Sequence, residues 1–518
     1  MAEKIEGRNL WELLERRAAA TPDRPMVIDD TGRVVTFAEY RVEAERAAAG
    51  LFHNGIGEGT VVSWQLPTWI ESIVLVAALS RLGAIQNPML PIYRQREVGF
   101  VTRQAKAKLL VVPGTWRTFD YEDMARTIAA DQPGLEVLVA NRVLPQGDPS
   151  ILPSPPAPLD DPADLPVRWY YYTSGTTSDP KGAQHTDKTI ESAAIGMCER
   201  LQVTEDDRIG CVFPFTHVAG AVYIFSALIY GCTMLVVEGF DAEATPPVLA
   251  ANGVTLAGAG TPFHMAYLAY QRNHPESAPL FPDARAYIGG GAPKPPQLHY
   301  DIKDAMGSVG IVSGYGMTEA PIVTMASVRD NDDDLANTEG APVTGVDLIT
   351  VKLDGSRAAT GEEGEIRLKA PMVMRGYIDS SLDIEAFDEN GYFRTGDLAV
   401  IDDRGNVRIT GRVKDIIIRN MENISAKELE DNLFAHPKVA DVAVIGLPDD
   451  RTGERACAVV VPADAGDPPS LSELCDYLLE RGLMKQKLPE QLEIIDALPR
   501  NPTGKIVKFE LRDRYAKP

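Results

Sequence analysis

Residues 172–182 (YTSGTTSDPKG) place glycines, hydroxyl side chains and one lysine directly after an aromatic, strand-like run over residues 167–172. Glycines let a loop approach a ligand closely, and a loop rich in N–H and O–H groups can donate to phosphate oxygens. The register differs from that of the Walker loop, because Lys181 lies between a proline and a glycine. The segment therefore predicts a polyphosphate site at the end of a strand, and a Ser/Thr-rich surface turn is the alternative interpretation.

Size and charge limit the classes of protein to consider. At 518 residues the chain is long enough for several domain-sized units, and 44% hydrophobic with 24% charged residues is typical of a globular protein. The net charge of −23 argues against general binding to nucleic acid or to an anionic membrane. It allows ATP or coenzyme A, which need only local cations such as Lys181, Arg412 and Lys505.

The cysteines and the two ends of the sequence favour a cytoplasmic protein. The five cysteines are scattered and form no CxxC pair, which fits reduced thiols and gives no zinc signature. The first residues lack the apolar region of a secretory signal, and the last three, Ala-Lys-Pro, are not a peroxisomal Ser-Lys-Leu tail.

An uncharged stretch over residues 218–237 has the length of a membrane span. Gly231 interrupts it, and tyrosine, serine, cysteine and threonine residues dilute it. We therefore expect a buried helix that ends near Tyr230, followed by a buried strand over residues 233–237, and no transmembrane segment.

Patterns along the chain predict an α/β fold. Leu10, Leu13, Leu14 and Ala18 have the spacing of a helix face, and residues 61–64 and 109–112 read as strands around an apolar helix over residues 73–82. Such alternation predicts parallel sheets wrapped by helices. Short strands and tight turns begin near residue 345, and residues 398–410 read as a hairpin. Beyond Arg412, capping-box spacings at residues 425–428 and 470–473 indicate a compact α+β unit.

Four further motifs carry side chains suited to nucleotide chemistry. They are Ser313-Gly314-Tyr315-Gly316-Met317-Thr318-Glu319, Thr395-Gly396-Asp397, Gly411-Arg412-Val413-Lys414-Asp415 and Asn501-Pro502-Thr503-Gly504-Lys505. We expect the first of them to be a loop that follows a strand over residues 309–312. A tyrosine could stack on a purine, a glutamate could bind Mg²⁺, and a carboxylate at a turn could accept both ribose hydroxyls. Each motif alone is weak, because turns commonly contain such residues.

These motifs, taken with residues 172–182, resemble in order the signatures of the AMP-forming adenylating enzymes. That superfamily comprises acyl-CoA synthetases, peptide-synthetase adenylation domains and luciferases. Gly289-Gly290-Gly291-Ala292-Pro293 resembles its adenine-side loop, and residues 214–220 (PFTHVAG) resemble its acyl-side segment. The resemblance implies a large N-terminal domain of helix-wrapped mixed sheets over residues 1–413, with a small β-barrel-like part over residues 345–413. It also implies a small mobile C-terminal α+β domain over residues 414–518, with a hinge at Lys414.

The resemblance also implies the ligands and the residues that bind them. The implied ligands are ATP, Mg²⁺, coenzyme A and a small-molecule carboxylic acid. The resemblance leaves homodimer formation open. Lys505, Thr176 and Lys181 are the implied catalytic residues, and Glu319 is the implied metal ligand. The implied nucleotide-binding residues are Thr173, Ser174, Gly175, Thr176, Thr177, Lys181, Gly291, Ala292, Pro293, Tyr315, Gly316, Thr318, Asp397, Arg412 and Lys505. The implied acyl-side residues are His217, Val218, Gly289, Gly290, Gly314 and Met317.

Two residues depart from the family pattern. Ser178 stands where a glycine is usual in the phosphate loop, and Met421 replaces a glycine that lines the passage for pantetheine. The second departure bears on transfer to a thiol rather than on adenylation. His217 has two interpretations, an acyl-orienting residue or a hydrogen-bonded core histidine.

The acyl-side segment disfavours an amino acid, because residues 215–222 contain no carboxylate to pair with an α-ammonium group. Small residues there and the glycine triplet at 289–291 are expected to leave room for an apolar medium-chain, alicyclic or aryl acid, as in cyclohexanecarboxylate-type acyl-CoA ligases. The leading hypothesis is an acid–CoA ligase. The alternatives are an enzyme that loads a carrier protein, a catalytically silent nucleotide-binding protein, and luciferase-type oxidation.

Overall fold

The computed structural model describes residues 4–157, 159, 161, 163–173, 180–277, 279–291, 294–419, 422–449, 451–501 and 504–516. Two large sheets form most of the molecule. The first has nine strands in the order β17 (Ala341–Pro342), β16 (Ala320–Met325), β15 (Ile311–Met317), β14 (Ala286–Gly289), β13 (Leu256–Ala257), β11 (Arg208–Cys211), β12 (Thr233–Val236), β1 (Pro25–Asp29) and β2 (Val34–Thr36). Its centre is parallel and its edge strands are antiparallel.

The second large sheet has six strands in the order β10 (Lys181–His185), β9 (Trp169–Thr173), β4 (Ile85–Pro88), β3 (Val61–Trp64), β5 (Leu109–Val112) and β8 (Glu136–Val139). All neighbours are parallel except β9 and β10, which form an antiparallel pair. A short hairpin of β6 (Thr115–Trp116) and β7 (Phe119–Asp120) lies beside it. The predicted helix-wrapped, mostly parallel α/β architecture is confirmed.

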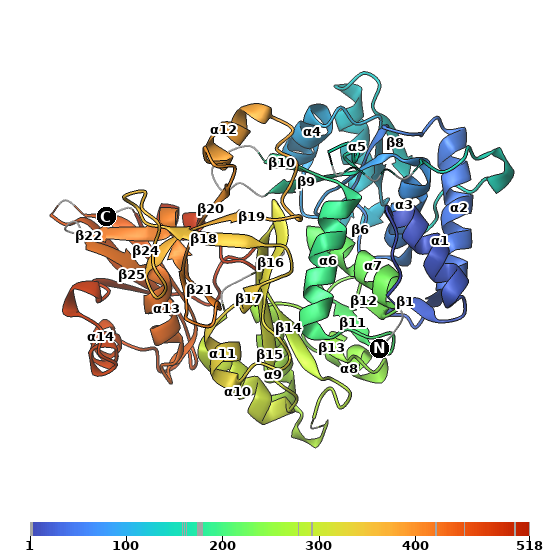
Figure 1. The fold of residues 1–518 in the computed structure, drawn as a ribbon. Coiled ribbons are helices and arrows are strands. Elements are labelled where there is room, and N and C mark those ends of the chain that lie inside the picture. The colour runs from blue at the N-terminus through green and yellow to red at the C-terminus, as the bar shows by residue number, and fades with distance from the viewer. Residues whose placement is uncertain are drawn as a thin grey trace.

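Helices cover both faces of these sheets. In chain order they are α1 (Leu10–Ala20), α2 (Phe37–His53), α3 (Ile70–Leu82), α4 (Gln95–Gln104), α5 (Tyr121–Ala130), η1 (Pro149–Ile151), α6 (Asp187–Leu201), α7 (Val218–Tyr230), α8 (Thr245–Ala251), α9 (Thr261–Asn273), η2 (Pro275–Ser277), α10 (Pro296–Met306) and α11 (Asp332–Asn337). One core joins side chains of both sheets to α1, α2, α3, α6 and α7, and α6 and α7 lie near the middle of the molecule (Figure 1).

The uncharged stretch is a buried helix followed by a strand, as predicted. Helix α7 ends at Tyr230, and Gly231 adopts a left-handed conformation with φ of 78°. That conformation favours glycine, which explains why the helix ends there. No helix among the described residues is both long enough and apolar enough to cross a bilayer.

The remaining strands form two smaller sheets. Strands β18 (Asp347–Val351), β19 (Glu363–Lys369), β20 (Phe393–Ile401) and β21 (Val407–Arg412) form an antiparallel sheet that includes the predicted hairpin. Strands β23 (Glu422–Ser425), β22 (Ile416–Arg419), β25 (Gly453–Pro462), β24 (Val439–Asp449) and β26 (Gln491–Ile494) form the C-terminal sheet. The short helices η3 (Ser380–Leu382) and α12 (Asp383–Ala386) precede β20, and η4 (Val413–Asp415) lies between the two sheets.

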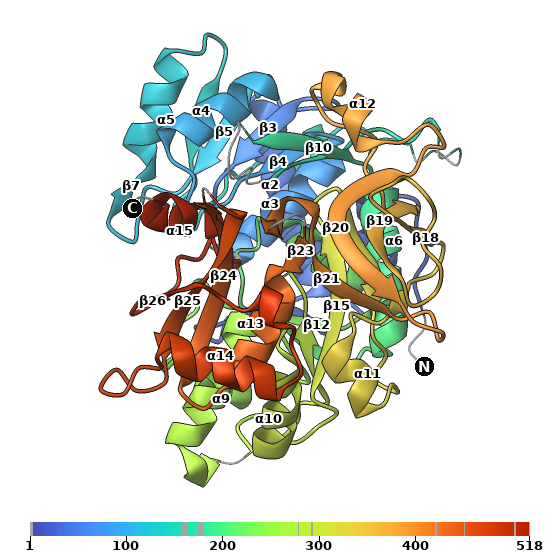
Figure 2. The same ribbon diagram turned by 90° about the vertical axis from the view of Figure 1, so that its left-hand side faces the viewer.

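Helices α13 (Ala426–Phe434), α14 (Leu471–Glu480) and α15 (Lys508–Tyr515), with η5 (Lys485–Lys487), cover the C-terminal sheet at one side of the molecule (Figures 1 and 2). The capping box at Ser470 and Glu473 is confirmed. At α13, Ser425 caps the helix, but the Glu428 carboxylate accepts a bond from Lys487 Nζ at 2.6 Å. The proposed hinge residue Lys414 lies in η4, and the division of the chain at this point stays a prediction.

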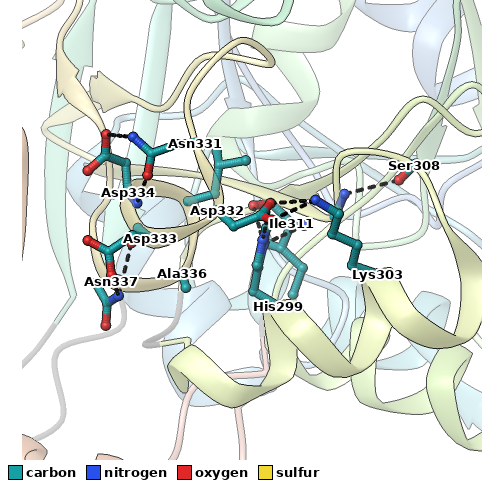
Figure 3. Close-up of polar contacts among 12 residues, drawn as sticks. His299, Lys303, Ser308, Ile311, Asn331, Asp332, Asp333, Asp334, Ala336 and Asn337 are labelled. Atoms are coloured by element: carbon teal, nitrogen blue, oxygen red, sulfur yellow. Dashed lines mark hydrogen bonds and ion pairs between the residues drawn. The ribbon is translucent and has the colours of Figure 1, made fainter.

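Polar contacts fix helices α10 and α11 in place. Figure 3 shows Lys303 of α10, whose ammonium donates to both carboxylate oxygens of Asp332 at 2.6 and 2.7 Å. His299 Nδ1 accepts from the backbone N–H of Ile311, the first residue of β15, at 3.1 Å. Lys294 Nζ donates to the carbonyl oxygens of Leu335 and Ala336 in α11. These bonds hold α10 and α11 against β15, which carries part of the candidate site.

Buried histidines predict that the fold loses stability in acid. Burial lowers the pKa of His264 to about 3 and that of His185 to about 4, so both are neutral at pH 7. Between pH 6.5 and these values the unfolded chain binds more protons, and stability therefore falls as the pH falls. Between pH 7 and pH 5, each of these two histidines should lower the free energy of unfolding by about 2 kcal/mol.

His264→Phe should remove its share of this loss. Its Nε2 atom is buried without a hydrogen-bond partner among the described residues, and its ring contacts the rings of Tyr267 and Tyr287. Phenylalanine preserves those ring contacts and cannot bind a proton. Urea unfolding at pH 7 and pH 5 would measure the difference, with the same change at exposed His53 as the control. An unchanged pH dependence in His264→Phe would contradict the prediction.

Candidate active site

Asp397 of β20 is a buried carboxylate that bonds two polar side chains. Its carboxylate Oδ2 accepts from the hydroxyl of Tyr315 at 2.7 Å, and its Oδ1 accepts from Arg412 Nε at 2.7 Å. The side chain is only 5% exposed, and the pairing of β20 with β21 shifts register between Leu398 and Ala399. Burial, and then the Asp397 charge, raise the pKa of Tyr315, so its phenol stays neutral and donates. Each carboxylate oxygen keeps acceptor capacity for a further donor, such as a ribose hydroxyl.

The tyrosine and the glutamate of the second motif lie on a hairpin rather than on a loop. We expected residues 313–319 to follow the strand as a loop, but β15 continues to Met317 and pairs antiparallel with β16. That pairing satisfies the backbone groups and extends the sheet past its parallel part. Gly316 packs closely in this hairpin, since a Cβ atom there would lie 1.9 Å from the Pro321 carbonyl oxygen. Thr318 and Glu319 form the turn.

Glu319 has a geometry that fits a cation. Its Oε1 accepts from the hydroxyl of Tyr377 at 2.8 Å, and no described residue bonds its Oε2. No group of three or more His, Cys, Asp or Glu side chains gathers as a metal site in the described part of the chain. A single half-buried carboxylate fits Mg²⁺, which is usually held by one or two carboxylates together with phosphates and water.

The two ends of the predicted phosphate loop lie opposite each other. Thr173, the last residue of β9, pairs with Lys181, the first residue of β10. The ammonium group of Lys181 lies 5.6 Å from the centroid of the Tyr377 ring. The predicted phosphate-binding residues between these ends, Ser174, Gly175, Thr176 and Thr177, and the departure at Ser178, lie outside the described residues.

Lys505 reaches this site from the C-terminal part of the chain. Its backbone N–H donates to the Asn501 side chain at 2.9 Å. The neighbouring Gly504 contacts α9, because a Cβ atom there would lie 2.5 Å from Pro262 Cγ. Figure 2 shows the C-terminal elements in front of the large domain, on the side where α9 and α10 also lie.

The charge of Lys505 interacts with the predicted nucleotide site. Burial and then the neighbouring Arg412 lower the pKa of its ammonium group, while Asp397 and Glu319 oppose that change. The structure thus brings Lys505 within electrostatic reach of the carboxylates of β20 and of the β15–β16 turn. The pKa of Lys414 is also lowered, by burial first and then by Arg412.

His217 is a hydrogen-bonded histidine at the start of α7, and its acyl-orienting role stays a prediction. It is the N-cap residue of α7, and its Nδ1 accepts from the backbone N–H of Ala219 at 3.2 Å. Burial, and then the charge of Lys505, lower its pKa to about 4. The imidazole is therefore neutral, with its proton on Nε2, and it lies close to Lys505. Val218, the next residue, is buried in the main core, and its acyl-side role also stays a prediction.

The glycines of the acyl-side set do not leave the room that we expected. A Cβ atom at Gly289 would lie 2.5 Å from Ser313 Oγ, and one at Gly314 would lie 2.5 Å from Met325 Sδ. At Gly290 it would lie 3.1 Å from the Gly314 carbonyl oxygen. These glycines allow close packing of strands, so the expectation of an open space above them is wrong. Gly291 has open space and a φ of 72°, while Ala292 and Pro293 lie outside the described residues.

Gly220 provides a test of this close packing. A Cβ atom there would lie 2.0 Å from the Phe215 carbonyl oxygen, so Gly220→Ala must distort the turn that carries His217. We expect a loss of about 2 kcal/mol in stability, as for an overpacked core, and a lower melting temperature. Gly57→Ala is the matched control, because nothing lies within 4 Å of its Cβ position. Equal melting temperatures for the two variants would contradict the prediction.

Two contacting residues were missed by the motif search. His185 Nε2 bonds the Thr318 carbonyl oxygen at 2.8 Å, and Tyr377 bonds Glu319. Neither belongs to one of the five motifs. Their roles arise from contacts across 133 and 58 residues of sequence, which no local pattern reveals.

Comparison with known protein families identifies the family of this chain. The family model described as "AMP-binding enzyme" matches residues 14–378, and the one described as "AMP-binding enzyme C-terminal domain" matches residues 428–505. The chain belongs to the AMP-binding enzyme family. The first match alone covers more than half of the chain, and the predicted superfamily is confirmed.

Similar proteins cover nearly the whole chain. A medium-chain fatty-acid–CoA ligase of Escherichia coli is 29% identical, over 97% of this chain and 90% of its own length. A salicyl-AMP ligase / salicyl-S-ArCP synthetase of Mycobacterium tuberculosis is 33% identical, also over 97% and 90%. The structure of ATP-bound MatB from Rhodopseudomonas palustris has a TM-score of 0.87 and 27% identity over 98% of this chain and 99% of that one. This member of the family is thus an AMP-forming ligase with the fold of the adenylating enzymes.

Proposed function

We propose that the chain is an ATP-dependent carboxylic acid–CoA ligase. In the first step a carboxylate oxygen of the acid attacks the α-phosphorus of ATP, the bond to the bridging oxygen breaks, and pyrophosphate leaves. In the second step the sulfur of CoA attacks the acyl carbon and loses its proton, and AMP leaves with the former carboxylate oxygen. The first step is needed because a carboxylate has no good leaving group.

The observation that carries this proposal is that the charge of Lys505, which comes from a distant part of the chain, interacts with the charges of Asp397 and Glu319. Negative charge on the phosphoryl oxygens dominates such reactions, so positioned cations supply most of the catalysis. In this proposal Lys505 neutralises the acid and the α-phosphate, and Lys181 with the hydroxyls of residues 173–177 holds the other phosphates. Asp397 and Arg412 bind ribose, and Tyr315 with residues 291–293 frames adenine.

Mg²⁺ completes the proposed ATP site. Glu319 would hold it through the carboxylate oxygen that no described residue bonds. When bound, the metal neutralises charge on the phosphate oxygens. The structures of relatives include an o-succinylbenzoate CoA synthetase from Bacillus subtilis in complex with ATP and magnesium ion, which supports ATP and Mg²⁺ as ligands of this chain.

The proposed acid is apolar: a medium-chain, alicyclic or aryl carboxylic acid. Residues 215–222 lack a carboxylate, and Phe213, Phe215 and Val222 are buried around α7. The names of the two relatives, with a medium-chain fatty acid and a salicyl group, support this class. A pyrophosphate-release screen over fatty, alicyclic and aryl acids tests it, and activity confined to amino acids would overturn it.

Transfer to a carrier protein is the second candidate function, because the 33%-identical relative is named as a salicyl-S-ArCP synthetase. Acid-dependent ATP–pyrophosphate exchange tests adenylation, and its absence with every acid would favour a catalytically silent protein. AMP release that depends on CoA then distinguishes the ligase from a carrier-loading enzyme. The effect of Met421 on this second step, the swing of the C-terminal domain at Lys414 and homodimer formation stay predictions.

A further inference from the structure

Tyr377 lies between two groups that the proposed function assigns to MgATP. Its hydroxyl donates to Glu319 Oε1 at 2.8 Å, and its ring centroid lies 5.6 Å from the Lys181 ammonium group. Tyr377 itself is only 5% exposed. One side chain therefore contacts both the proposed metal ligand and the proposed phosphate-binding lysine, which come from different sheets.

The backbone around Tyr377 is fixed by the same two elements. The N–H groups of Arg375 and Ile378 donate to the carbonyl oxygens of Gln184 and Gly182 in β10, both at 2.8 Å. The N–H of Met374 donates to the carbonyl oxygen of Glu319 at 2.8 Å. This segment therefore ties the strand that begins at Lys181 to the turn that carries Glu319.

The N–H and carbonyl groups of Tyr377 are bonded as well. Its N–H donates to Asp383 Oδ1 at 2.9 Å, and its carbonyl oxygen accepts from Gln184 Nε2 at 3.0 Å. These bonds fix the backbone of Tyr377, and the ring is buried against Ala183, Met374 and Phe393, so the groups that it contacts are positioned before a ligand binds.

The chemistry of the phenol suits such a role. A phenol hydroxyl can donate a hydrogen bond, and that of Tyr377 donates to the Glu319 carboxylate at 2.8 Å. The bond orients one carboxylate oxygen and leaves the other for a cation. The negative face of an aromatic ring attracts an ammonium group at this distance.

We infer that Tyr377 is a positioning residue for MgATP, which orients Glu319 toward the metal through its hydroxyl and Lys181 toward the phosphates through its ring. The inference rests on the proposed function, and it adds a residue outside the five motifs. It predicts that the two parts of the side chain have separable effects.

Tyr377→Phe tests the hydroxyl. Binding of a non-hydrolysable ATP analogue is measured by calorimetry at a series of free Mg²⁺ concentrations, which requires neither the acid nor turnover. We expect the Mg²⁺ concentration for half-maximal binding to rise about 10-fold, the usual scale for losing a hydrogen bond to a metal ligand. Binding at saturating Mg²⁺ should stay within about 3-fold of the unmodified chain, because the ring remains.

Tyr392→Phe is a closely matched control. The Tyr392 hydroxyl donates to the Asp347 carboxylate at 2.6 Å, and its ring lies 4.4 Å from the Lys369 ammonium group. It thus has the same two kinds of contact at the surface of the four-stranded sheet, and it lies outside the proposed ATP site. This variant should show the Mg²⁺ dependence of the unmodified chain.

Two further variants separate positioning from a structural effect. In a Glu319→Gln background, Tyr377→Phe should cause no additional change in Mg²⁺ dependence, because the bond acts through Glu319. Tyr377→Leu should weaken binding at saturating Mg²⁺ beyond the effect of Tyr377→Phe, because Lys181 loses the ring. Thermal unfolding of each variant verifies that it is folded at the assay temperature.

The outcomes also distinguish this inference from the proposed function. If the unmodified chain binds the analogue with Mg²⁺ and Tyr377→Phe has the same Mg²⁺ dependence, the inference is overturned while the function stands. If the two changes are additive in the Glu319→Gln background, Tyr377 does not act through Glu319 and the inference is again overturned. If the unmodified chain does not bind MgATP, both are overturned.

Discussion

Lys505→Ala should slow formation of the acyl-adenylate about 100-fold or more, the scale of losing one preorganised donor to a developing charge. The ammonium group lies within electrostatic reach of Asp397 and Glu319, where the nucleotide is proposed to bind. Without it, the repulsion between the acid and the α-phosphate is no longer neutralised. Acid-dependent ATP–pyrophosphate exchange measures this step directly.

The effect of Lys505→Ala should be confined to the first step. Acyl-CoA formation from a supplied acyl-adenylate should proceed within about 10-fold of the normal rate, because pyrophosphate has already left. Lys485→Ala removes an exposed lysine of the same C-terminal region and should leave both steps unchanged. Equal losses in both steps for Lys505→Ala would indicate a general structural defect instead, and unchanged exchange would overturn the proposed mechanism.

The sequence predicted those elements whose ends carry strong local signals. Helix α7 and strand β12 follow from an uncharged stretch that is interrupted by one glycine, and Gly231 indeed adopts a left-handed conformation. Helix α14 likewise begins at a capping box, which the spacing of Ser470 and Glu473 predicts from sequence alone. Such signals act over a few residues, so they remain visible without tertiary structure.

Sequence patterns could not predict contacts between distant strands. The pairing of β15 with β16 turned an expected loop into a hairpin, because hydrogen bonds to a neighbouring strand override the loop tendency of glycine-rich residues. The small size of Gly289 and Gly314 suggested open space, whereas neighbouring strands fill it. Periodicity and composition do not report on such packing.

The candidate site shows the same limit. The motifs named Asp397, Arg412, Glu319 and Lys505, and the structure brings these charges together. The residue that links two of the motifs, Tyr377, has no motif of its own and was found only through its contacts. Motifs identify residues that touch a ligand, whereas residues that position them are identified by geometry.

Asp397→Ala should have the second large effect, on both ATP binding and stability. The change removes the acceptor for the proposed ribose hydroxyls. A hydrogen bond to a charged group contributes about 1.5–3 kcal/mol, so the loss of two such bonds should lower the affinity for ATP about 100-fold or more. It also leaves the Tyr315 hydroxyl and Arg412 Nε without their shared partner. Arg412 is exposed and can bond water, but the Tyr315 hydroxyl lies inside, and a buried donor without an acceptor costs about 1–3 kcal/mol, so the melting temperature should fall. Calorimetric titration with ATP and thermal unfolding measure the two effects.

Asp397→Asn separates ATP binding from stability. The amide oxygen can still accept from Tyr315 or Arg412, so most of the stability should return, but the charge that strengthens bonds to ribose is absent. Asp347→Ala is the control, because Asp347 also accepts from a tyrosine hydroxyl but is exposed on β18. If Asp397→Asn binds ATP as tightly as the unmodified chain, the carboxylate holds Tyr315 and Arg412 in place and ribose recognition must come from other residues.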